Sequence, residues 1–376
     1  MIIYFDNAAT TPPSEKAREA FLSSLDCYGN PSSLHSKGIE AAKILDTART
    51  QVASSLGCDK SEIIFTGGGS ESNNQAIFGL ARTNSRRSKR IITGSGEHPS
   101  VESPLAQLEG EGFEIIRISV KGGSPDYDEL ERVCREGSVA LVTFMLVNNE
   151  SGAYYDIGRI RRIIDGTGCG AKFHCDAVQG FLKTPDRHEI KKYCDTASIS
   201  AHKIGGIKGC GALFIKKGSN LKPYILGGGQ EGGLRSGTEN VPGIAAFGAA
   251  CADFTPEKVA HISELYDTAV RLIGERLGSR AVFHVPERHV PTILSVSVLG
   301  VRSEVMLNAL SSEGICVSAS SACSSRRGAS KVMESFGLSK QELDSSLRIS
   351  FGQDNTLEEC AVLAEKLAEI AKRIGR

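Results

Sequence analysis

Three short segments place polar residues directly after an apolar run, where a ligand could be held. The first is Gly67-Gly68-Gly69-Ser70, between a predicted strand and a predicted helix. Glycines let the backbone approach a ligand closely, Ser70 can cap the helix, and free N–H groups at a helix start favour a phosphate. A structural turn before a capped helix explains these residues about equally well. Phosphate binding therefore needs support from the other segments.

The second segment ends in a carboxylate and the third in a lysine. Asp176 follows the apolar run Phe173-His174-Cys175, and Lys203 follows Ser200-Ala201-His202. Open α/β sheets bind ligands at the carboxyl ends of their strands, where Asp176 can pair with a cationic ring nitrogen. A desolvated lysine has a lowered pKa and can form a Schiff base with a carbonyl cofactor. Taken singly, Asp176 is better explained as a helix cap and Lys203 as a surface lysine.

Taken together, the three segments describe one kind of site. They supply, in chain order, a phosphate cradle, an acid for a pyridinium nitrogen and a Schiff-base lysine. This is the inventory of a pyridoxal 5'-phosphate site. The alternative of a nucleotide-binding α/β protein is weakened because the glycine segment lacks both Walker and GxGxxG spacing. Two histidines after predicted strands, His98 and His202, are candidates for proton transfer and for phosphate binding, although a lone loop histidine is usually structural.

A fourth segment, residues 317–330, carries a cysteine among small polar residues. Its composition predicts an exposed, mobile loop, and Arg326 and Arg327 are close enough in sequence to favour a thiolate at Cys323. An inert thiol in a serine-rich loop is the alternative. Most of the other ten cysteines lie in or beside apolar runs, as core residues do.

The elements that must position these residues alternate along the first 250 residues. Short apolar runs and longer amphipathic stretches predict an α/β fold, with a mostly parallel sheet covered by helices on both faces. The clearest helix follows Ser36 and ends at Gly57, and a long helical stretch runs from about Ala245 to Gly278. The expected strands are 62–66, 90–93, 114–119, 139–144, 172–175, 196–200 and 212–215, followed by 292–298 and 346–350 before a closing helix at 356–374.

This pattern predicts two domains. Residues 1–250 are expected to form a large cofactor-binding α/β domain, and residues 251–376 a smaller C-terminal α+β domain that carries the Cys323 loop. The first ~15 residues are expected to pack on either domain, the small one included.

Composition and charge exclude several classes of protein. The 44 Lys and Arg residues equal the 44 Asp and Glu residues, which argues against nucleic-acid binding through bulk positive charge. No apolar run approaches the roughly 18 to 20 residues that span a bilayer. The 11 cysteines form no CxxC pair, which fits neither a disulfide framework nor a common zinc module. We therefore expect a cytoplasmic protein without a metal site and without nucleic-acid or membrane partners.

The sequence resembles the cysteine desulfurases of the class V aminotransferase superfamily, from Tyr4 to about Gly352. The motifs that carry this resemblance occur in order: residues 4–12 (YFDNAATTP), 29–33 (GNPSS), 65–74, Glu97-His98, Asn148-Asn149-Glu150, 174–179, Ser200-Ala201-His202-Lys203, 227–240, Ser321-Ala322-Cys323 and 346–352. The resemblance implies a fold type I pyridoxal-phosphate enzyme. It also implies a homodimer with active sites at the subunit boundary, and the conversion of L-cysteine to L-alanine with a persulfide left on Cys323.

The resemblance also implies a role for each matching residue. Lys203 corresponds to the Schiff-base lysine, Asp176 to the partner of the pyridine nitrogen, and His98 to the residue that stacks on the ring and moves protons. The ring hydroxyl would be bound by Gln179 and Asn149. The phosphate would be held by Gly69, Ser70, Ser200 and His202, and by Thr238 from the other subunit. The substrate contacts would be Arg348, Asn149 and Asn7.

Some segments depart from the family pattern. The loop reads Ser318-Ala319-Ser320-Ser321-Ala322-Cys323 without the usual glycine, Arg327-Gly328-Ala329-Ser330 replaces a segment with proline, and Ser70 replaces a threonine. These changes affect the choice of sulfur-acceptor protein, such as an iron-sulfur scaffold or a tRNA or cofactor thiolation protein, more than they affect catalysis. A selenocysteine lyase, a small-substrate aminotransferase and a pyridoxal-fold protein without turnover are the alternatives. Cys323 argues against transamination, which does not use such a thiol.

Overall fold

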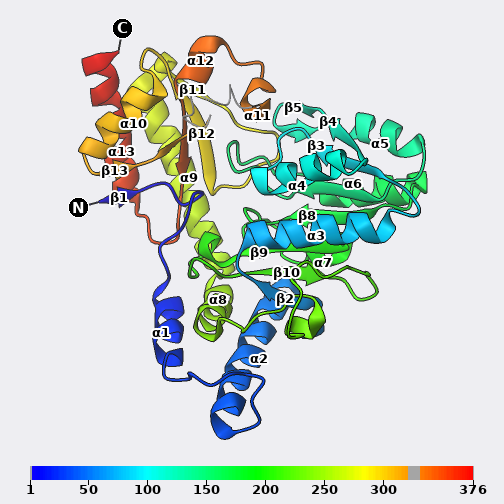
Figure 1. Cartoon of the computed structure of the whole chain (residues 1–376). Coiled ribbons are helices and arrows are strands. Elements are labelled where there is room, and N and C mark those ends of the chain that lie inside the picture. The colour runs from blue at the N-terminus through cyan, green and yellow to red at the C-terminus, as the bar shows by residue number, and fades with distance from the viewer. Residues whose placement is uncertain (1, 321–330, 376) are drawn as a thin grey trace.

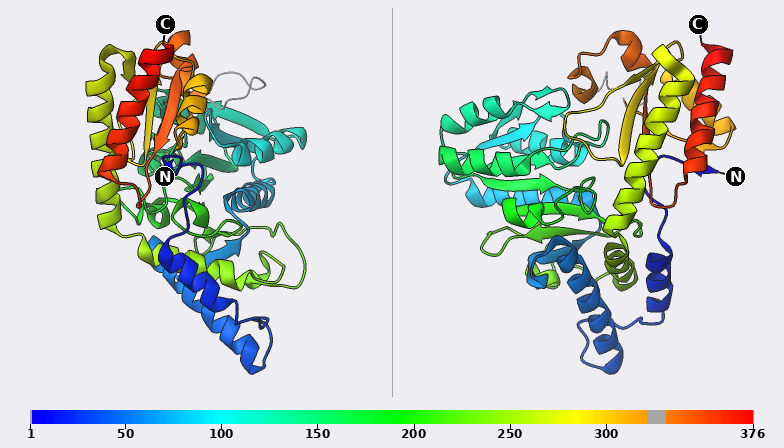
Figure 2. Two further views of the ribbon diagram at one scale, coloured as in Figure 1. Left: turned by 90° about the vertical axis from the view of Figure 1, so that its left-hand side faces the viewer. Right: turned by 180° about the vertical axis from the view of Figure 1, so that it is seen from behind.

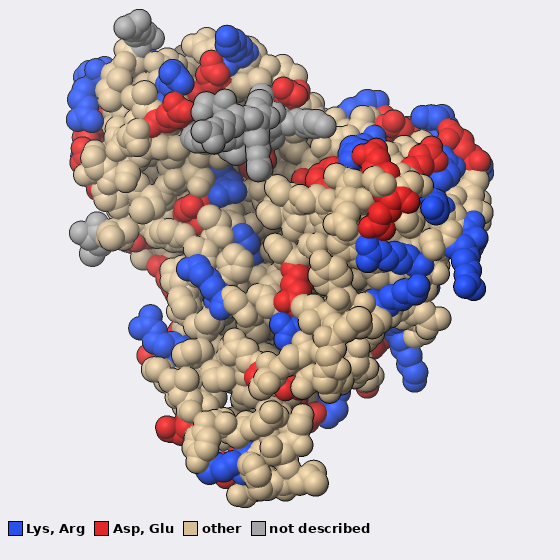
Figure 3. Space-filling model, viewed as in Figure 1, with Lys and Arg blue, Asp and Glu red and all other residues tan. Residues whose placement is uncertain are grey.

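The computed structural model describes residues 2–320 and 331–375, and long helices join its two larger β-sheets (Figure 1). Cys323, Arg326 and Arg327 lie outside the described residues. Charges of both signs are interspersed over the face seen in Figure 3, in keeping with the equal numbers of acidic and basic residues. Within the described ranges, no helix is both long enough and apolar enough to cross a bilayer.

The larger sheet has seven strands and is mostly parallel, as predicted. Its spatial order is β2-β10-β9-β8-β7-β3-β4, and only β10 runs antiparallel to its neighbours β9 and β2. The carboxyl ends of β7, β8 and β9 therefore meet at one edge. The strands are β2 (Ile63–Thr66), β3 (Arg90–Gly94), β4 (Glu114–Ile118), β7 (Leu141–Met145), β8 (Lys172–Asp176), β9 (Thr196–Ser200) and β10 (Gly211–Ile215).

Helices cover both faces of this sheet because its side chains alternate between two apolar cores. Ile91 and Leu141 pack in the same cluster as residues of α3 (Gly69–Asn84) and α4 (Pro99–Gly110). The next residues along the same strands, Ile92 and Val142, join the main core with α5, α6 and α7. The latter helices are α5 (Tyr127–Arg135), α6 (Ile157–Thr167) and α7 (Glu189–Tyr193).

The second sheet has four antiparallel strands in the order β11-β12-β15-β14. Its strands are β11 (Ala281–Phe283), β12 (Ile293–Val298), β14 (Ser318–Ala319) and β15 (Ser346–Ser350). Figure 2 shows α9 and α13 running side by side along this sheet. The helices of this part are α9 (Pro256–Leu277), α10 (Ser303–Ser312), α11 (Lys331–Glu334), α12 (Lys340–Asp344) and α13 (Leu357–Ile374).

The N-terminal segment crosses from one sheet to the other. Strand β1 (Ile3–Tyr4) pairs in parallel with β13 (Ile315–Cys316), and Asp6 forms a bridge with Ser350. The chain then enters α1 (Glu15–Ser24), which packs against α8 (Val241–Asp253), and α8 also packs against α2 (Ser36–Leu56). The proposed division at residue 250 remains a prediction. The remaining elements are the hairpin of β5 (Val120–Lys121) and β6 (Ser124–Pro125) and the short 3-10 turns η1 (Lys60–Glu62), η2 (Ala201–Lys203), η3 (Glu231–Gly233) and η4 (Gly278–Arg280).

The long helix expected from about Ala245 to Gly278 is two helices. Helix α8 ends at Asp253, and α9 begins at Pro256 after Thr255, whose backbone is extended. Proline lacks a backbone N–H and disfavours the helical conformation of the residue before it. Pro256 therefore interrupts the helix and becomes the first residue of the next one.

Asn355 ties the N-terminal segment to the second sheet. Its Nδ2 donates to the Tyr4 carbonyl at 3.0 Å, and its Oδ1 accepts from Gly352 N at 2.8 Å and from Asn7 Nδ2 at 3.2 Å. The side chain is buried, so its loss would leave several polar groups without partners.

We expect Asn355→Ala to lower the free energy of unfolding by about 1–3 kcal/mol, the cost of leaving buried polar groups unpaired. Chemical denaturation monitored by circular dichroism measures the change. Asp354→Ala is the matched control, because Asp354 is the adjacent residue and is exposed. Equal denaturation midpoints for the two variants would contradict this role of Asn355.

Candidate active site

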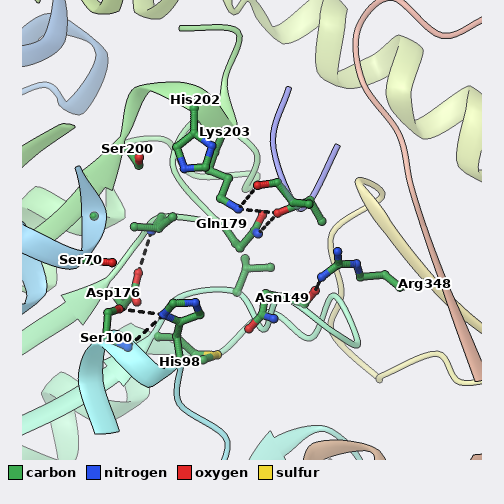
Figure 4. A pocket seen from close by; sticks show the side chains of 16 residues that line it. Ser70, His98, Ser100, Asn149, Asp176, Gln179, Ser200, His202, Lys203 and Arg348 are labelled. Atoms are coloured by element: carbon green, nitrogen blue, oxygen red, sulfur yellow. Dashed lines mark hydrogen bonds between the residues drawn. The ribbon is translucent and has the colours of Figure 1, made fainter. Parts of the chain in front are cut away.

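A cavity of about 440 Å³ lies where the two sheets approach each other (Figure 4). The large sheet contributes the last residues of β7, β8 and β9, and the second sheet contributes Arg348 of β15. The start of α3 and the N-terminal segment complete the wall. The polar side chains that line the cavity are Ser70, His98, Ser100, Asn149, Asp176, Gln179, Ser200, His202, Lys203 and Arg348.

One end of the cavity is built to receive an anion. Helix α3 begins there at Gly69, and its N-cap residue Gly68 provides no side-chain hydrogen bond, so the first N–H groups stay open. A Cβ atom on Gly69 would lie 2.5 Å from Val178 Cγ2, which explains why glycine is needed. The buried Ser200 Oγ has no hydrogen-bond partner among the described residues.

His202 stands beside this end as a neutral ring. Burial, assisted by the charge of Lys203, lowers the pKa of His202 to about 4. Its Nδ1 lies 3.1 Å from Thr10 Oγ1. His202 can therefore offer a hydrogen bond to an anion without carrying a charge of its own.

Lys203 enters the cavity because β9 ends at Ser200 and the chain turns through Ala201–Lys203. Its Nζ donates to the carbonyls of Ala8 at 2.5 Å and Ala9 at 2.9 Å. Desolvation, followed by the charge of Arg348, lowers the pKa of Lys203 to about 8. A substantial share of this amine is consequently neutral, and therefore nucleophilic, near physiological pH.

Asp176 and Gln179 lie at the end of β8. Asp176 Oδ1 accepts from Val178 N at 3.0 Å, and Oδ2 accepts from Asn73 Nδ2 at 2.8 Å. The Gln179 amide donates to Ala8 O at 2.7 Å, whereas its buried Oε1 has no hydrogen-bond partner in the described structure. These contacts hold a carboxylate and an amide oxygen rigidly at the cavity wall.

His98 is the N-cap of α4, and its ring faces the cavity (Figure 4). The ring Nδ1 accepts from Ser100 N at 3.1 Å and lies 2.8 Å from Ser100 Oγ. Desolvation lowers the pKa of His98, against the opposing charge of Asp176. The ring is therefore mostly neutral at pH 7.

Arg348 is fixed by two acceptors on opposite elements. One guanidinium nitrogen donates to Asn149 O at 2.9 Å and the other to Asp6 Oδ1 at 2.9 Å. The same Asp6 oxygen accepts from Ser318 Oγ at 2.8 Å. The buried Arg348 Nε has no hydrogen-bond partner among the described residues, so one N–H of the fork stays open.

The residues present fit pyridoxal phosphate. The buried Ser200 Oγ and Gln179 Oε1 line the cavity and have no protein partner within the described ranges, which suits a bound polar group. The open N–H groups at the start of α3 suit the binding of a phosphate group. The amine of Lys203, which is largely desolvated, suits condensation with a carbonyl group.

The structure brings most of the expected site residues together and places two of the described ones, Asn7 and Thr238, outside this cavity. Asn7 lines a small adjoining cavity, and its amide is used by the Ser350 carbonyl at 3.0 Å and by Asn355. Thr238 is exposed and lies outside the cavity of its own chain. Cys323 is outside the described residues. The roles expected of these three residues remain predictions.

Sequence reasoning missed four residues near the site: Asn73, Ser100, Asp6 and Lys183. Lys183 is buried, and desolvation together with the charge of Lys203 lowers its pKa to about 7. The only available signals were weak: Ser100 follows a His-Pro pair typical of a helix start, and Asp6 and Asn73 stand within recognised motifs. Nothing near Lys183 in the sequence indicates that it lies beside Lys203.

We expect the reactivity of Lys203 towards an amine-modifying reagent to rise between pH 7 and pH 9 and then level off. Only the neutral amine reacts, and a pKa of about 8 places the midpoint in this range, below the ordinary value near 10.4. Trace labelling with fluorodinitrobenzene and peptide mass analysis measures it, with exposed Lys217 as internal reference. A midpoint for Lys203 above pH 10 would contradict this expectation.

Comparison with known proteins identifies the family. The aminotransferase class-V family model matches residues 3–363. A cysteine desulfurase of Trichormus azollae is 37% identical over 384 aligned residues, which cover 99% of this chain and 94% of the relative. A solved NifS-like protein superposes with a TM-score of 0.91 at 35% identity, covering 99% of this chain and 100% of its own. A structure described as SspA in complex with cysteine gives 0.78 at 30% identity, covering 94% and 100%. As its motifs predicted, the chain belongs to the cysteine desulfurases of the aminotransferase class-V family.

Proposed function

We propose that this protein converts L-cysteine to L-alanine with pyridoxal phosphate as its cofactor, and that the sulfur is left as a persulfide on Cys323. One observation carries the proposal. One cavity is lined by the desolvated Lys203, by Asp176 at the end of a strand, and by Arg348, whose Nε has no hydrogen-bond partner among the described residues. The strand that leads to Cys323 pairs with the strand that carries Arg348. The similar structure described as containing cysteine supports the choice of substrate.

When bound, pyridoxal phosphate supplies a carbonyl that condenses with amines and a ring that absorbs the electrons left when a Cα proton departs. Asp176 would pair with the ring nitrogen, and His98 would lie against the ring. Gln179 and Asn149 would bind the ring hydroxyl. The phosphate would be held by Gly69, Ser70, Ser200 and His202, and by Thr238 of a second copy of the chain.

Lys203 both binds the cofactor carbonyl and moves the substrate proton. Its Nζ, with a pKa lowered to about 8, takes the proton from the substrate Cα. The carbonyls of Ala8 and Ala9 hold this nitrogen, so it stays inside the cavity. The same two carbonyls favour its charged form after it has accepted a proton.

Arg348 binds the substrate carboxylate. A guanidinium fork suits a carboxylate because it offers parallel N–H donors, and the Arg348 Nε is a buried donor without a described partner. Asp6 and the Asn149 carbonyl fix the plane of the fork. The substrate therefore enters a pre-oriented site, in which its carboxylate competes with Asp6 for part of the fork.

The strand that precedes the Cys323 segment pairs with the strand that carries Arg348. Ser318 pairs with Arg348 and Ala319 with Leu347. Cys323 follows Ser320 by three residues, which span at most about 10 Å when fully extended. Its thiolate would form an S–S bond with the substrate sulfur while the substrate Cβ–S bond breaks and its electrons pass to carbon. Cβ then takes up a proton and Lys203 returns the proton to Cα, so that alanine leaves and sulfur remains oxidised as the persulfide.

The persulfide would serve a sulfur-acceptor protein in the cytoplasm, for iron-sulfur cluster assembly or for thiolation of tRNA or a cofactor. A homodimer with shared active sites is part of the proposal, because Thr238 is exposed and away from the cavity of its own chain. Arg326 and Arg327 beside the carrier would favour an acceptor with an acidic surface.

We expect Cys323→Ala to abolish formation of alanine and sulfide from L-cysteine in the presence of a reductant, while cofactor binding is retained. Alanine and sulfide assays with matched cofactor occupancy measure the effect. Cys27→Ala is the control, because Cys27 is a partly exposed cysteine in another part of the chain. Full formation of alanine and sulfide by Cys323→Ala would remove Cys323 as the sulfur carrier. If the natural protein with bound cofactor made no alanine, selenocysteine or an amino-group acceptor would be tried next.

We expect Arg348→Lys to raise the KM for L-cysteine about ten- to a hundredfold, because lysine cannot reproduce a bidentate contact with a carboxylate. Steady-state kinetics separate this effect from a change in kcat. Arg302→Lys, at an exposed position on the same part of the chain, is the control. An unchanged KM in Arg348→Lys would remove Arg348 from the substrate site.

A further inference from the structure

A series of hydrogen bonds links Asp176 to His98, and both residues line the cavity. Figure 4 shows its last link, between Ser100 and His98. Two residues that no motif singled out for chemistry, Asn73 and Ser100, form the links. Asn73 is fully buried on α3, and its amide group makes three hydrogen bonds. Each hydrogen-bonded group in this series has a known number of protons. The position of each proton therefore follows from the position of the one before it.

The Asp176 carboxylate fixes the orientation of the Asn73 amide. Asp176 uses both oxygens as acceptors, so the Asn73 group that faces it must be the NH2. The Asn73 carbonyl oxygen then faces His174 Nε2 at 3.0 Å, which must donate. His174 Nδ1 therefore accepts from Thr196 Oγ1 at 2.9 Å. Complete burial lowers the pKa of His174 to about 3, in keeping with this neutral ring.

The second N–H of Asn73 continues the chain toward the cavity. It donates to Ser100 Oγ at 2.8 Å. A hydroxyl has a single proton, and here it points to His98 Nδ1, 2.8 Å away. Ser100 N donates to the same ring nitrogen at 3.1 Å. His98 Nδ1 thus accepts two hydrogen bonds, and the one proton of the neutral ring must sit on Nε2.

We infer that Asn73 and Ser100 are positioning residues that hold His98 as its Nε2–H tautomer, so that the resting enzyme offers a proton donor to the cavity. The catalytic meaning of this inference rests on the proposed function, whereas the tautomer itself does not. To take up a proton at Nδ1, His98 would have to turn the Ser100 hydroxyl and repel the Ser100 N–H. His98 therefore begins the reaction as a proton donor.

The other charged groups around His98 leave this arrangement in place. Asp176 favours the charged ring and Lys203 disfavours it, with desolvation as the larger effect. The neighbouring Glu97 is buried, and burial raises its pKa well above the ordinary value, which disfavours its charged form. Arg348, on the far wall of the same cavity, adds a positive charge that also favours the neutral ring.

A purely structural role does not explain all the hydrogen bonds between Asp176 and His98. An N-cap at His98 needs only the bond from Ser100 N to Nδ1. The bonds from Asn73 to Ser100 and from Asn73 to Asp176 add nothing to the cap, yet they occupy a fully buried amide. Their effect is to orient the Ser100 hydroxyl toward the ring.

The test is nitrogen NMR of the full chain labelled with 15N-histidine, with and without pyridoxal phosphate, across a pH series. His98→Gln identifies the His98 signals among those of the eight histidines. In the natural protein we expect His98 to be protonated at Nε2 and unprotonated at Nδ1. In Ser100→Ala we expect the His98 titration midpoint to rise by about half to one pH unit, because the neutral ring loses an acceptor contact at Nδ1.

Three variants sharpen the result. Ser100→Thr keeps the hydroxyl and should restore the natural midpoint, whereas Ser103→Ala, at an exposed position of the same helix, should not alter it. Asn73→Ala should raise the His98 midpoint and also change the His174 Nε2 signal. A His98 ring protonated at Nδ1 in the natural protein would overturn the inference, as would unchanged midpoints in Ser100→Ala and Asn73→Ala together. Because tautomers are read without turnover, these outcomes are independent of whether the protein desulfurates cysteine.

Discussion

The site depends on keeping one amine, Lys203 Nζ, away from water and in one place. Two backbone carbonyls, of Ala8 and Ala9, hold this nitrogen, and they belong to a segment from the far end of the chain. That segment is in turn anchored to the second sheet through Asn7 and Asn355. The lowered pKa of Lys203 therefore results from long-range packing that desolvates the amine, and any change that loosens the N-terminal segment would admit water to it.

The charges in the cavity are arranged so that each is opposed or fixed by a neighbour. Arg348 lowers the pKa of Lys203, while Asp176 and Asp6 act in the opposite direction. Asp6 also fixes the Arg348 fork and accepts from Ser318 on β14. One carboxylate thereby couples the arginine, the N-terminal segment and the strand that precedes the Cys323 segment.

Both sheets are needed to form the cavity. The large sheet supplies a parallel edge at which the ends of β7, β8 and β9 converge, and polar groups there lie close together without a special loop. The second sheet supplies Arg348, on a strand whose other residues are buried. Buried hydrogen bonds such as Asn73–Asp176 then hold the side chains rigidly, which matters because proton transfer requires donor and acceptor at hydrogen-bond distance.

Much of this protein is determined locally by its sequence. The ends of β8 and β9, the glycine turn before α3 and the helix after Ser36 follow from apolar runs, turn residues and caps, which act over a few residues. Pro256 signalled the break between α8 and α9, a local cue outweighed by the helical pattern around it. The tertiary structure alone decided which distant groups meet: Asp6 with Arg348, Lys183 beside Lys203, and Asn73 between Asp176 and Ser100. These pairings depend on how the sheets and helices pack, because hydrogen bonds between residues far apart in sequence leave no periodic trace along the chain.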